Sequence, residues 1–268
     1  MRRIDESEGR GLFGLNPAGY DAVRPPYPAA SFSLLEDQGA LFPGASTLEI
    51  GPGNGLATRA LVARGASPLT VVEPQLAFEG LLRSLADGSR CDFRFVQAAF
   101  EDATLPSASF DLVVAATMYH WLDPETRVER IAELLRPGGH VALLWNVFRS
   151  RHRPNPIDEA TRHLVAHLAA SPAGGQDAVP FPLDREQREA EFRRGGCFEP
   201  RAYLELQWTL RLDSTGLGLL YEGFSPIARL PEAERRSLID QVRAVADQEL
   251  GGIVDLYMTS VTYLWKRR

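Results

Sequence analysis

Lysine, cysteine and long apolar runs are scarce or missing in these 268 residues. Lys266 is the only lysine among 29 basic residues, which leaves 28 arginines, so an arginine by itself does not mark a site. Cys91 and Cys197 cannot build a disulfide framework or a Cys/His zinc set, and this scarcity predicts a reducing, cytoplasmic compartment. No apolar run approaches the roughly 18 residues of a membrane span. The net charge of −6 argues against a general attraction to nucleic acid or to an anionic membrane.

The hydrophobic share of 44% is typical of a globular protein with a substantial core. From about residue 45 to residue 147, short β-rich runs alternate with helical patterns, which predicts βαβ units around a parallel sheet. The expected strands are 46–50, 69–73, 92–96, 110–116 and 140–147. The expected helices are about 55–64, about 75–86 and 125–135. The last helix should stop at a turn formed by Arg136-Pro137-Gly138-Gly139.

Proline and glycine interrupt this rhythm after residue 147. The Pro- and Gly-rich segment 149–182 predicts an insertion laid over the sheet. The remaining expected elements are strands at 202–212 and 255–267 and helices at about 214–223 and 231–249. Because β patterns return so late, the sheet should be completed near residue 268. We therefore expect an arm at 1–44 and one domain at 45–268, with a lid insertion at about 148–197.

A glycine-rich turn follows the first expected strand, in the order Glu49-Ile50-Gly51-Pro52-Gly53-Asn54-Gly55. Glycines between a strand and a helix permit positive φ and let a ligand approach backbone N–H groups at the helix N-terminus. The dinucleotide fingerprint G-x-G-x-x-G would need glycine at position 56, which is Leu56. The pattern E-x-G-x-G-x-G therefore indicates a different ligand.

Two acidic residues narrow the choice of ligand. Glu49 lies at the carboxyl end of the first expected strand, where a carboxylate would repel a pyrophosphate but attract an ammonium or sulfonium group. Glu73 ends the next strand, where a carboxylate can accept hydrogen bonds from both hydroxyls of a ribose. Together they predict a nucleoside with a positively charged amino-acid arm, which is S-adenosylmethionine.

With these motifs the sequence resembles the class I S-adenosylmethionine-dependent methyltransferases over nearly its whole length. The resemblance rests on LEIGPGNG at 48–55, VVEP at 71–74 and LLRPGGHVALLW at 134–145. Further pieces at 20–28, 98–106 and 118–125 look like a small-molecule subgroup akin to trans-aconitate methyltransferase. The resemblance implies a three-layer α/β, Rossmann-like fold with a mainly parallel seven-stranded sheet, an antiparallel strand near its edge, and the inserted lid. It also implies methyl transfer from S-adenosylmethionine to a small-molecule acceptor.

The resemblance assigns residues to the cofactor side of the site. It places the three glycines against the methionine part, Glu49 near the amino group and Glu73 on the ribose. Ala99 and Phe100 would border the adenine, but many relatives have Asp at the position of Ala99, so the contact to the adenine amino group stays unassigned. Two arm residues are candidates to close over the cofactor. The full expected set is Tyr20, Arg24, Glu49, Gly51, Gly53, Gly55, Glu73, Pro74, Ala99, Phe100 and Glu101.

On the acceptor side, His120 follows the expected strand 110–116 at its carboxyl end, where open α/β sheets bind their ligands. It is a candidate general base, and the alternative is a hydrogen-bonded wall of the pocket. Tyr27, Trp121, Trp145 and Asn146 are the other candidate acceptor residues, each with packing as its alternative. No metal-ligand set is expected, and the choice between monomer and homodimer stays open.

Two other classes of protein share parts of this pattern. A non-catalytic S-adenosylmethionine-binding protein would keep the cofactor pocket and lose the acceptor site. A nicotinamide-dependent oxidoreductase would share the strand, the glycine turn and the acid, but Leu56 argues against it.

Overall fold

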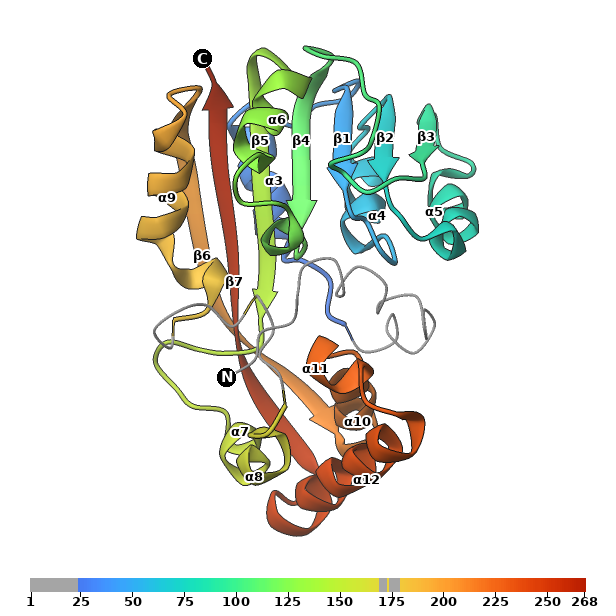
Figure 1. Cartoon of the computed structure of the whole chain (residues 1–268), viewed down its shortest axis with the longest axis vertical. Coiled ribbons are helices and arrows are strands. Elements are labelled where there is room, and N and C mark those ends of the chain that lie inside the picture. The colour runs from blue at the N-terminus through green and yellow to red at the C-terminus, as the bar shows by residue number, and fades with distance from the viewer. Residues whose placement is uncertain (1–23, 169–172, 174–178) are drawn as a thin grey trace. The chain divides into compact units, whose positions relative to one another are not determined.

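A computed structural model describes residues 24–168, 173 and 179–268 of the chain (Figure 1). Its contacts divide the protein into two compact units. Among the described residues, the first, here called the sheet unit, comprises 26–145, 179–205 and 261–268. The second, the helical unit, comprises the described residues 24–25, 146–168, 173 and 206–260.

The described residues form one seven-stranded sheet with the strand order β3-β2-β1-β4-β5-β7-β6. The strands are β1 Thr47–Ile50, β2 Leu69–Val72, β3 Phe93–Val96, β4 Phe110–Ala116, β5 Leu135–Val147, β6 Phe198–Asp213 and β7 Ile253–Arg267. The first five strands are parallel to one another, and Figure 1 shows β7, which is next to β5, running in the opposite direction. This confirms the expected mainly parallel sheet with an antiparallel strand near its edge.

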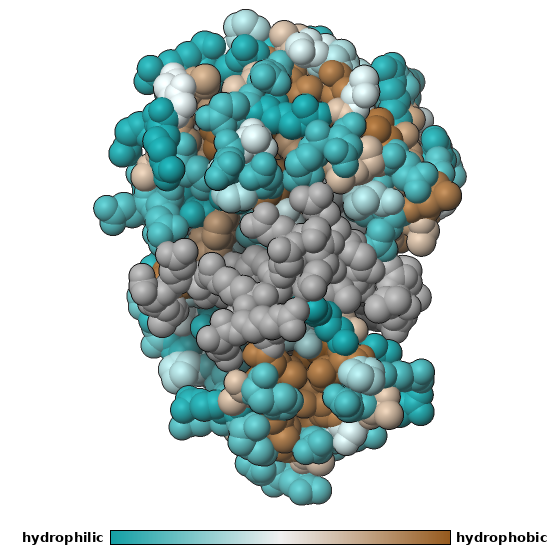
Figure 2. Space-filling view, in the orientation of Figure 1, coloured by the Kyte–Doolittle hydropathy of each residue, from teal (hydrophilic) through white to brown (hydrophobic). Residues whose placement is uncertain are grey.

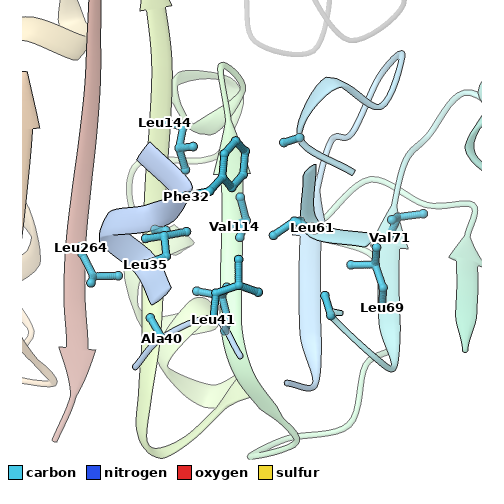
Figure 3. Packing of buried hydrophobic residues seen from close by; sticks show 14 of the residues in the cluster. Phe32, Leu35, Ala40, Leu41, Leu61, Leu69, Val71, Val114, Leu144 and Leu264 are labelled. Carbon is cyan, nitrogen blue, oxygen red and sulfur yellow. The ribbon is translucent and has the colours of Figure 1, made fainter. Parts of the chain in front are cut away.

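On one face of the sheet unit, three helices cover the strands: α3 Ala29–Asp37, α4 Leu56–Ala63 and α5 Glu79–Ala86. Phe32 and Leu35 of α3 and Leu61 of α4 pack on Val114 and Leu144 of the sheet in a single buried cluster (Figure 3). β1, β2 and most of β4 are buried on both faces, which is why they are mainly apolar in the sequence, whereas β3 at the edge of the sheet is only partly buried.

The other face of the sheet unit carries α6 Arg127–Leu134 and α9 Arg185–Arg194. Phe192 of α9 stacks on Trp265 of β7, with ring centroids 3.9 Å apart. Hydrophilic side chains predominate on the outer side of α9 in Figure 2, as its sequence of arginines and glutamates requires. With helices on both faces, the sheet unit has the three layers of the expected fold.

The described residues of the helical unit include the helices α7 Pro156–Ala160, α8 Arg162–Val165, α10 Ser214–Glu222, α11 Ser225–Ala228 and α12 Glu232–Glu249. Their apolar residues form a separate core in which Ile157, Leu217 and Val242 are fully buried. Among the described residues, no helix combines the length and apolarity needed to cross a bilayer.

Most expected elements of the first 147 residues are confirmed within one or two positions, and β4 matches the expected strand 110–116 at both ends. Helix α6 ends at Leu134 and Gly138 has a positive φ of +80, as expected, but the segment 136–139 lies within β5, which begins at Leu135 and not at residue 140. Leu135 pairs with Phe110 and His140 with Leu112, so the pairing is irregular at 136–139. A side chain at Gly139 would lie 3.1 Å from the Phe110 carbonyl oxygen, so glycine is what lets the strand continue there.

Candidate functional site

The glycine turn lies at the point where the strand order of the sheet reverses. β1 is hydrogen-bonded to β2 on one side and to β4 on the other, so its carboxyl end lies beside those of both neighbours. Ligands of open α/β sheets bind at this switch point, outside the carboxyl ends of the strands. The segments 51–55, 73–76 and 117–122 follow β1, β2 and β4 here.

Two glycines of the turn differ in their surroundings within the described part of the chain: Gly51 is packed against a side chain, and Gly53 faces open space. Gly51 has φ +60, and a side chain added there would lie 3.0 Å from Cγ of Met118, so this glycine packs against the segment after β4. Gly53 has φ +52, and an added Cβ would meet no atom of the described residues within 4 Å. A ligand can therefore reach the backbone at Gly53, while Gly51 joins the glycine turn to the segment that holds His120.

Glu49 is completely buried on β1, one residue before the strand ends. The Thr58 hydroxyl donates to its Oε2 at 2.6 Å, and its Oε1 has no hydrogen-bond partner among the described residues. Burial raises the pKa of Glu49 from 4.5 to about 7. A buried acceptor with unused capacity is costly unless a ligand donor reaches it, so this carboxyl group fits the ammonium of the methionine arm.

Glu73 is buried next to Gly53 and is held by two backbone donors. Gly53 N–H donates to Oε2 at 3.3 Å, and Gln75 N–H donates to Oε1 at 3.1 Å. Burial also raises the pKa of Glu73. Each carboxylate oxygen keeps further acceptor capacity, so the fixed carboxylate can still accept ribose hydroxyls. Pro74, which follows it, is exposed.

The segment expected to border the adenine is fixed by an arginine of α6. Arg130 Nε donates to the carbonyl oxygen of Phe100 at 2.9 Å, and its Nη2 donates to that of Ala103. Glu101 Oε1 accepts from the backbone N–H of Asp123 at 3.2 Å, which ties this segment to the one after β4. Ala99 is half-buried beside it.

The segment after β4 begins with a strained residue. Thr117 has φ +56, a conformation that costs a β-branched residue energy and that clusters at functional sites. Its hydroxyl is 2.7 Å from the hydroxyl of Tyr27, a candidate acceptor residue. Tyr27 and the segment after β4 are therefore joined within the sheet unit.

A short 3-10 helix, η2 Tyr119–Trp121, carries the candidate base. His120 and Trp121 are buried, with 4% and 5% of their surface exposed, and Trp145 at the end of the sheet-unit part of β5 is 1% exposed. Trp145 Nε1 donates to Nδ1 of His120 at 3.3 Å. Three of the expected acceptor-side residues therefore lie together, in an environment that excludes bulk water.

Phe181 lies beside the acceptor-side residues but is not among the site residues predicted from the sequence. It begins the 3-10 helix η4 Phe181–Leu183, and its ring centroid lies 6.0 Å from that of His120 and 6.1 Å from that of Trp145. Phe181 is the only phenylalanine in the segment 149–182, and no periodicity around it marks it as a site residue. Arg127, Arg130 and Glu191 were missed for a related reason, since charged residues on short helices usually read as solvated.

Some expected site residues belong to the helical unit. Arg24 Nη2 donates to the Gly223 carbonyl at 3.3 Å. Asn146 Nδ2 donates to the Pro25 carbonyl at 3.0 Å, and its Oδ1 accepts from the Ser260 hydroxyl at 2.6 Å. Tyr20 lies outside the described residues. Their expected contacts with cofactor or acceptor stay predictions.

Comparison with known proteins agrees with this geometry. Residues 48–143 match a family described as Methyltransferase domain. An uncharacterised methyltransferase of Schizosaccharomyces pombe is 24% identical over 255 residues, which cover 94% of this chain and 95% of that protein. The matched domain holds the glycine turn, Glu49, Glu73 and His120, but not Phe181 or α9.

Solved structures share the fold. A candidate type II methyltransferase from Anaeromyxobacter dehalogenans aligns with a TM-score of 0.60 and 21% identity, over 92% of this chain and 98% of that one. Geranyl diphosphate C-methyltransferase from Streptomyces coelicolor A3(2), in a complex that includes S-adenosyl-L-homocysteine, aligns with a TM-score of 0.50 and 14% identity, over 90% of this chain and 79% of that one. The matched domain and the shared fold support a class I S-adenosylmethionine-dependent methyltransferase, and the buried carboxyl groups of Glu49 and Glu73 fit S-adenosylmethionine as its cofactor.

Proposed function

We propose that the protein transfers the methyl group of S-adenosylmethionine to a small-molecule acceptor by in-line displacement. The observation that carries this proposal is the burial of His120, Trp121 and Trp145, each no more than 5% exposed, next to the glycine turn. A polymer would need an open groove at the reacting centre, whereas a small molecule can enter a closed, aromatic-lined site. The net charge of −6 also disfavours a nucleic acid acceptor.

The cofactor side follows from the donors and acceptors already described. Glu49 would hold the ammonium, Glu73 the ribose hydroxyls, and the open backbone at Gly53 would border the methionine arm. When bound, S-adenosylmethionine supplies a methyl group activated by its sulfonium, which an acceptor atom attacks opposite the breaking C–S bond. We propose that Tyr20, Arg24 and the remaining expected cofactor residues also contact the cofactor.

On the acceptor side, the chain mainly has to align the reactants and exclude water. His120 and Trp121 on η2 would form one wall, Trp145 a second, and Tyr27 a third through its hydrogen bond to Thr117. Asn146 would orient the acceptor, the insertion at about 148–197 would form a lid, and the arm at 1–44 would cover the cofactor. A base is needed only for an acceptor that must lose a proton, and His120 is the candidate for that role.

The acceptor class can be tested without knowing the acceptor. The protein is incubated with methyl-labelled S-adenosylmethionine and a cell extract, which is then separated into low-mass, protein and nucleic acid fractions. Label should accumulate in the low-mass fraction, and label in protein or nucleic acid would overturn the proposal. Once the product is known, a cofactor with a chiral methyl group should give inversion at carbon, as one in-line displacement requires, and retention would refute it.

A further inference from the structure

Helix α9 contributes a buried carboxylate to the segment after β4. Glu191 accepts a hydrogen bond from the Tyr119 hydroxyl at 2.6 Å and another from Arg127 Nε at 2.6 Å. Its second oxygen lies 3.3 Å from Nη1 of Arg188. The Glu191 side chain is 10% exposed, that of Arg127 6% and that of Arg188 4%. One carboxylate therefore joins two buried guanidinium groups and a phenol.

These contacts converge on the short helix that carries His120 and Trp121. Arg127 Nη1 donates to the carbonyl oxygens of Tyr119 and Leu122, the residues on either side of that pair, at 3.1 and 3.3 Å. Burial raises the pKa of Tyr119 well above 10, so its hydroxyl stays protonated and donates to Glu191. The arginine fixes the backbone of η2 at both ends, and Glu191 fixes the arginine.

The same carboxylate also reaches the opposite wall of the site through Arg188. The guanidinium carbon of Arg188 lies 3.5 Å from the ring centroid of Phe181, and that ring faces His120 and Trp145 at about 6 Å. Glu191 is thus linked through Arg127 to the helix η2, which carries His120 and Trp121, and through Arg188 to the ring of Phe181.

Docking of α9 on the sheet does not depend on this carboxylate. Phe192, its neighbour in sequence, stacks on Trp265 and packs edge-on against Phe198 at 5.3 Å. Without the charge of Glu191, Arg127 and Arg188 would be two buried cations with no shared anion, and they would move apart. Such movement would shift η2 and Phe181 while the helix stayed in place.

We propose that Glu191 is a positioning residue for methyl transfer, which holds His120, Trp121 and Phe181 in the arrangement that the acceptor requires. This inference rests on the proposed function, because it takes η2 as a wall of the acceptor site. Glu191 and Arg188 lie outside the matched domain 48–143, whereas Tyr119 and Arg127 lie within it, so the proposed device joins that domain to helix α9.

The test compares Glu191→Gln with the matched control Glu189→Gln on the same helix. Glu189 pairs with Arg185 at 2.6 Å on the solvent side, where an ion pair contributes little. Both variants and the wild type are labelled with 5-fluorotryptophan, and the four resonances are assigned by single Trp→Phe exchanges. The ¹⁹F spectra should show displaced or broadened resonances of Trp121 and Trp145 in Glu191→Gln, with Trp208 unchanged and no displacement in the control.

Calorimetry with S-adenosylhomocysteine should give the same Kd for all three proteins, since Glu191 contacts nothing on the cofactor side. With an acceptor in hand, kcat/KM for it should fall about 100-fold in Glu191→Gln, the scale expected for a misplaced reactant. Unmoved Trp121 and Trp145 resonances would overturn the proposal. If Glu191→Gln does not fold, Tyr119→Phe replaces it, with a smaller displacement of the same two resonances expected and no displacement overturning the inference.

The two proposals fail in different ways. Label recovered in protein or nucleic acid would overturn the small-molecule acceptor, whatever the spectra show. The ¹⁹F comparison needs no acceptor, so it decides the role of Glu191 in either case.

Discussion

Glu49 couples the stability of the protein to pH through its burial. Its pKa lies at about 7 in the folded protein, against 4.5 for an exposed carboxyl group. Between these values the folded chain keeps the proton that the unfolded chain releases. The stabilising contribution is therefore complete below pH 4.5 and is lost as the pH rises to about 7.

The size of this effect follows from the gap between the two pKa values. With about 1.4 kcal/mol for each unit, Glu49 should cost the folded state about 3 kcal/mol at pH 8. Glu49→Gln keeps the shape of the side chain and an oxygen that can accept from Thr58, but it removes the charge. We expect this variant to be more stable than the wild type at pH 8 by up to about 3 kcal/mol, and equally stable near pH 4.5.

The same exchange should weaken cofactor binding. A hydrogen bond to a charged group contributes about 1.5–3 kcal/mol, so the affinity for S-adenosylhomocysteine should fall about 10- to 100-fold at pH 8. Urea unfolding between pH 4.5 and 8.5 measures the first effect, and calorimetry at pH 8 measures the second. Glu79→Gln is the control, because Glu79 forms an exposed pair with Arg83.

Three results would refute this reasoning. A Glu49→Gln variant less stable than the wild type at pH 8 would show that the buried charge is not costly. A stability difference that stays constant between pH 4.5 and 7 would show that the group does not titrate there. Unchanged or tighter binding of S-adenosylhomocysteine would remove Glu49 from the ammonium contact.

Two further predictions concern the glycine turn and the candidate base. Gly53→Ala and Gly39→Ala place a side chain at φ +52 and φ +67, and in the part of the chain that the structure describes no atom lies within 4 Å of either added Cβ. Both variants should therefore lose about 1 kcal/mol of unfolding free energy in urea. Only Gly53→Ala should weaken S-adenosylhomocysteine in calorimetry, and equal binding by both would contradict the site. Because Trp145 donates to Nδ1 of His120, ¹⁵N NMR should find the neutral ring protonated at Nε2, and Trp145→Phe should reduce that preference; an Nδ1-protonated ring in the wild type would contradict this.

The sequence predicts an element correctly where a single physical requirement determines which residues can occupy it. The strand 110–116 is recognisable because a parallel strand buried on both faces is mainly apolar, and Asp111 is its only charged residue. The start of β5 is different, since Pro137 and the two glycines after it are typical of a turn. There the pairing of Leu135 with Phe110 begins the strand before the residues that favour a turn. A local sequence pattern cannot predict pairing with a residue 25 positions away.

The cofactor side was recognisable for a similar reason, and α9 was not. Glu49 and Glu73 are acids at the ends of apolar runs, where a charge has no structural purpose of its own. Helix α9 has only Phe192 and Arg188 buried, so no apolar stripe marks the face that meets the sheet. On its inner face the guanidinium of Arg188 lies over the ring of Phe181, and the carboxylate of Glu191 lies between Arg127 and Arg188. A search for hydrophobic periodicity does not detect such contacts.

Because arginine is so abundant, the sequence does not show which arginines belong to the site, but the structure shows a role for two of them. On α6, Arg127 and Arg130 are three residues apart and therefore share a face. The first donates to carbonyl oxygens around His120, and the second to those of Phe100 and Ala103. Several fixed donors on one planar group allow each side chain to bind two carbonyl oxygens at once, which the single point charge of a lysine does less well. One helix thus fixes the segments after β3 and β4, where cofactor and acceptor are expected to meet.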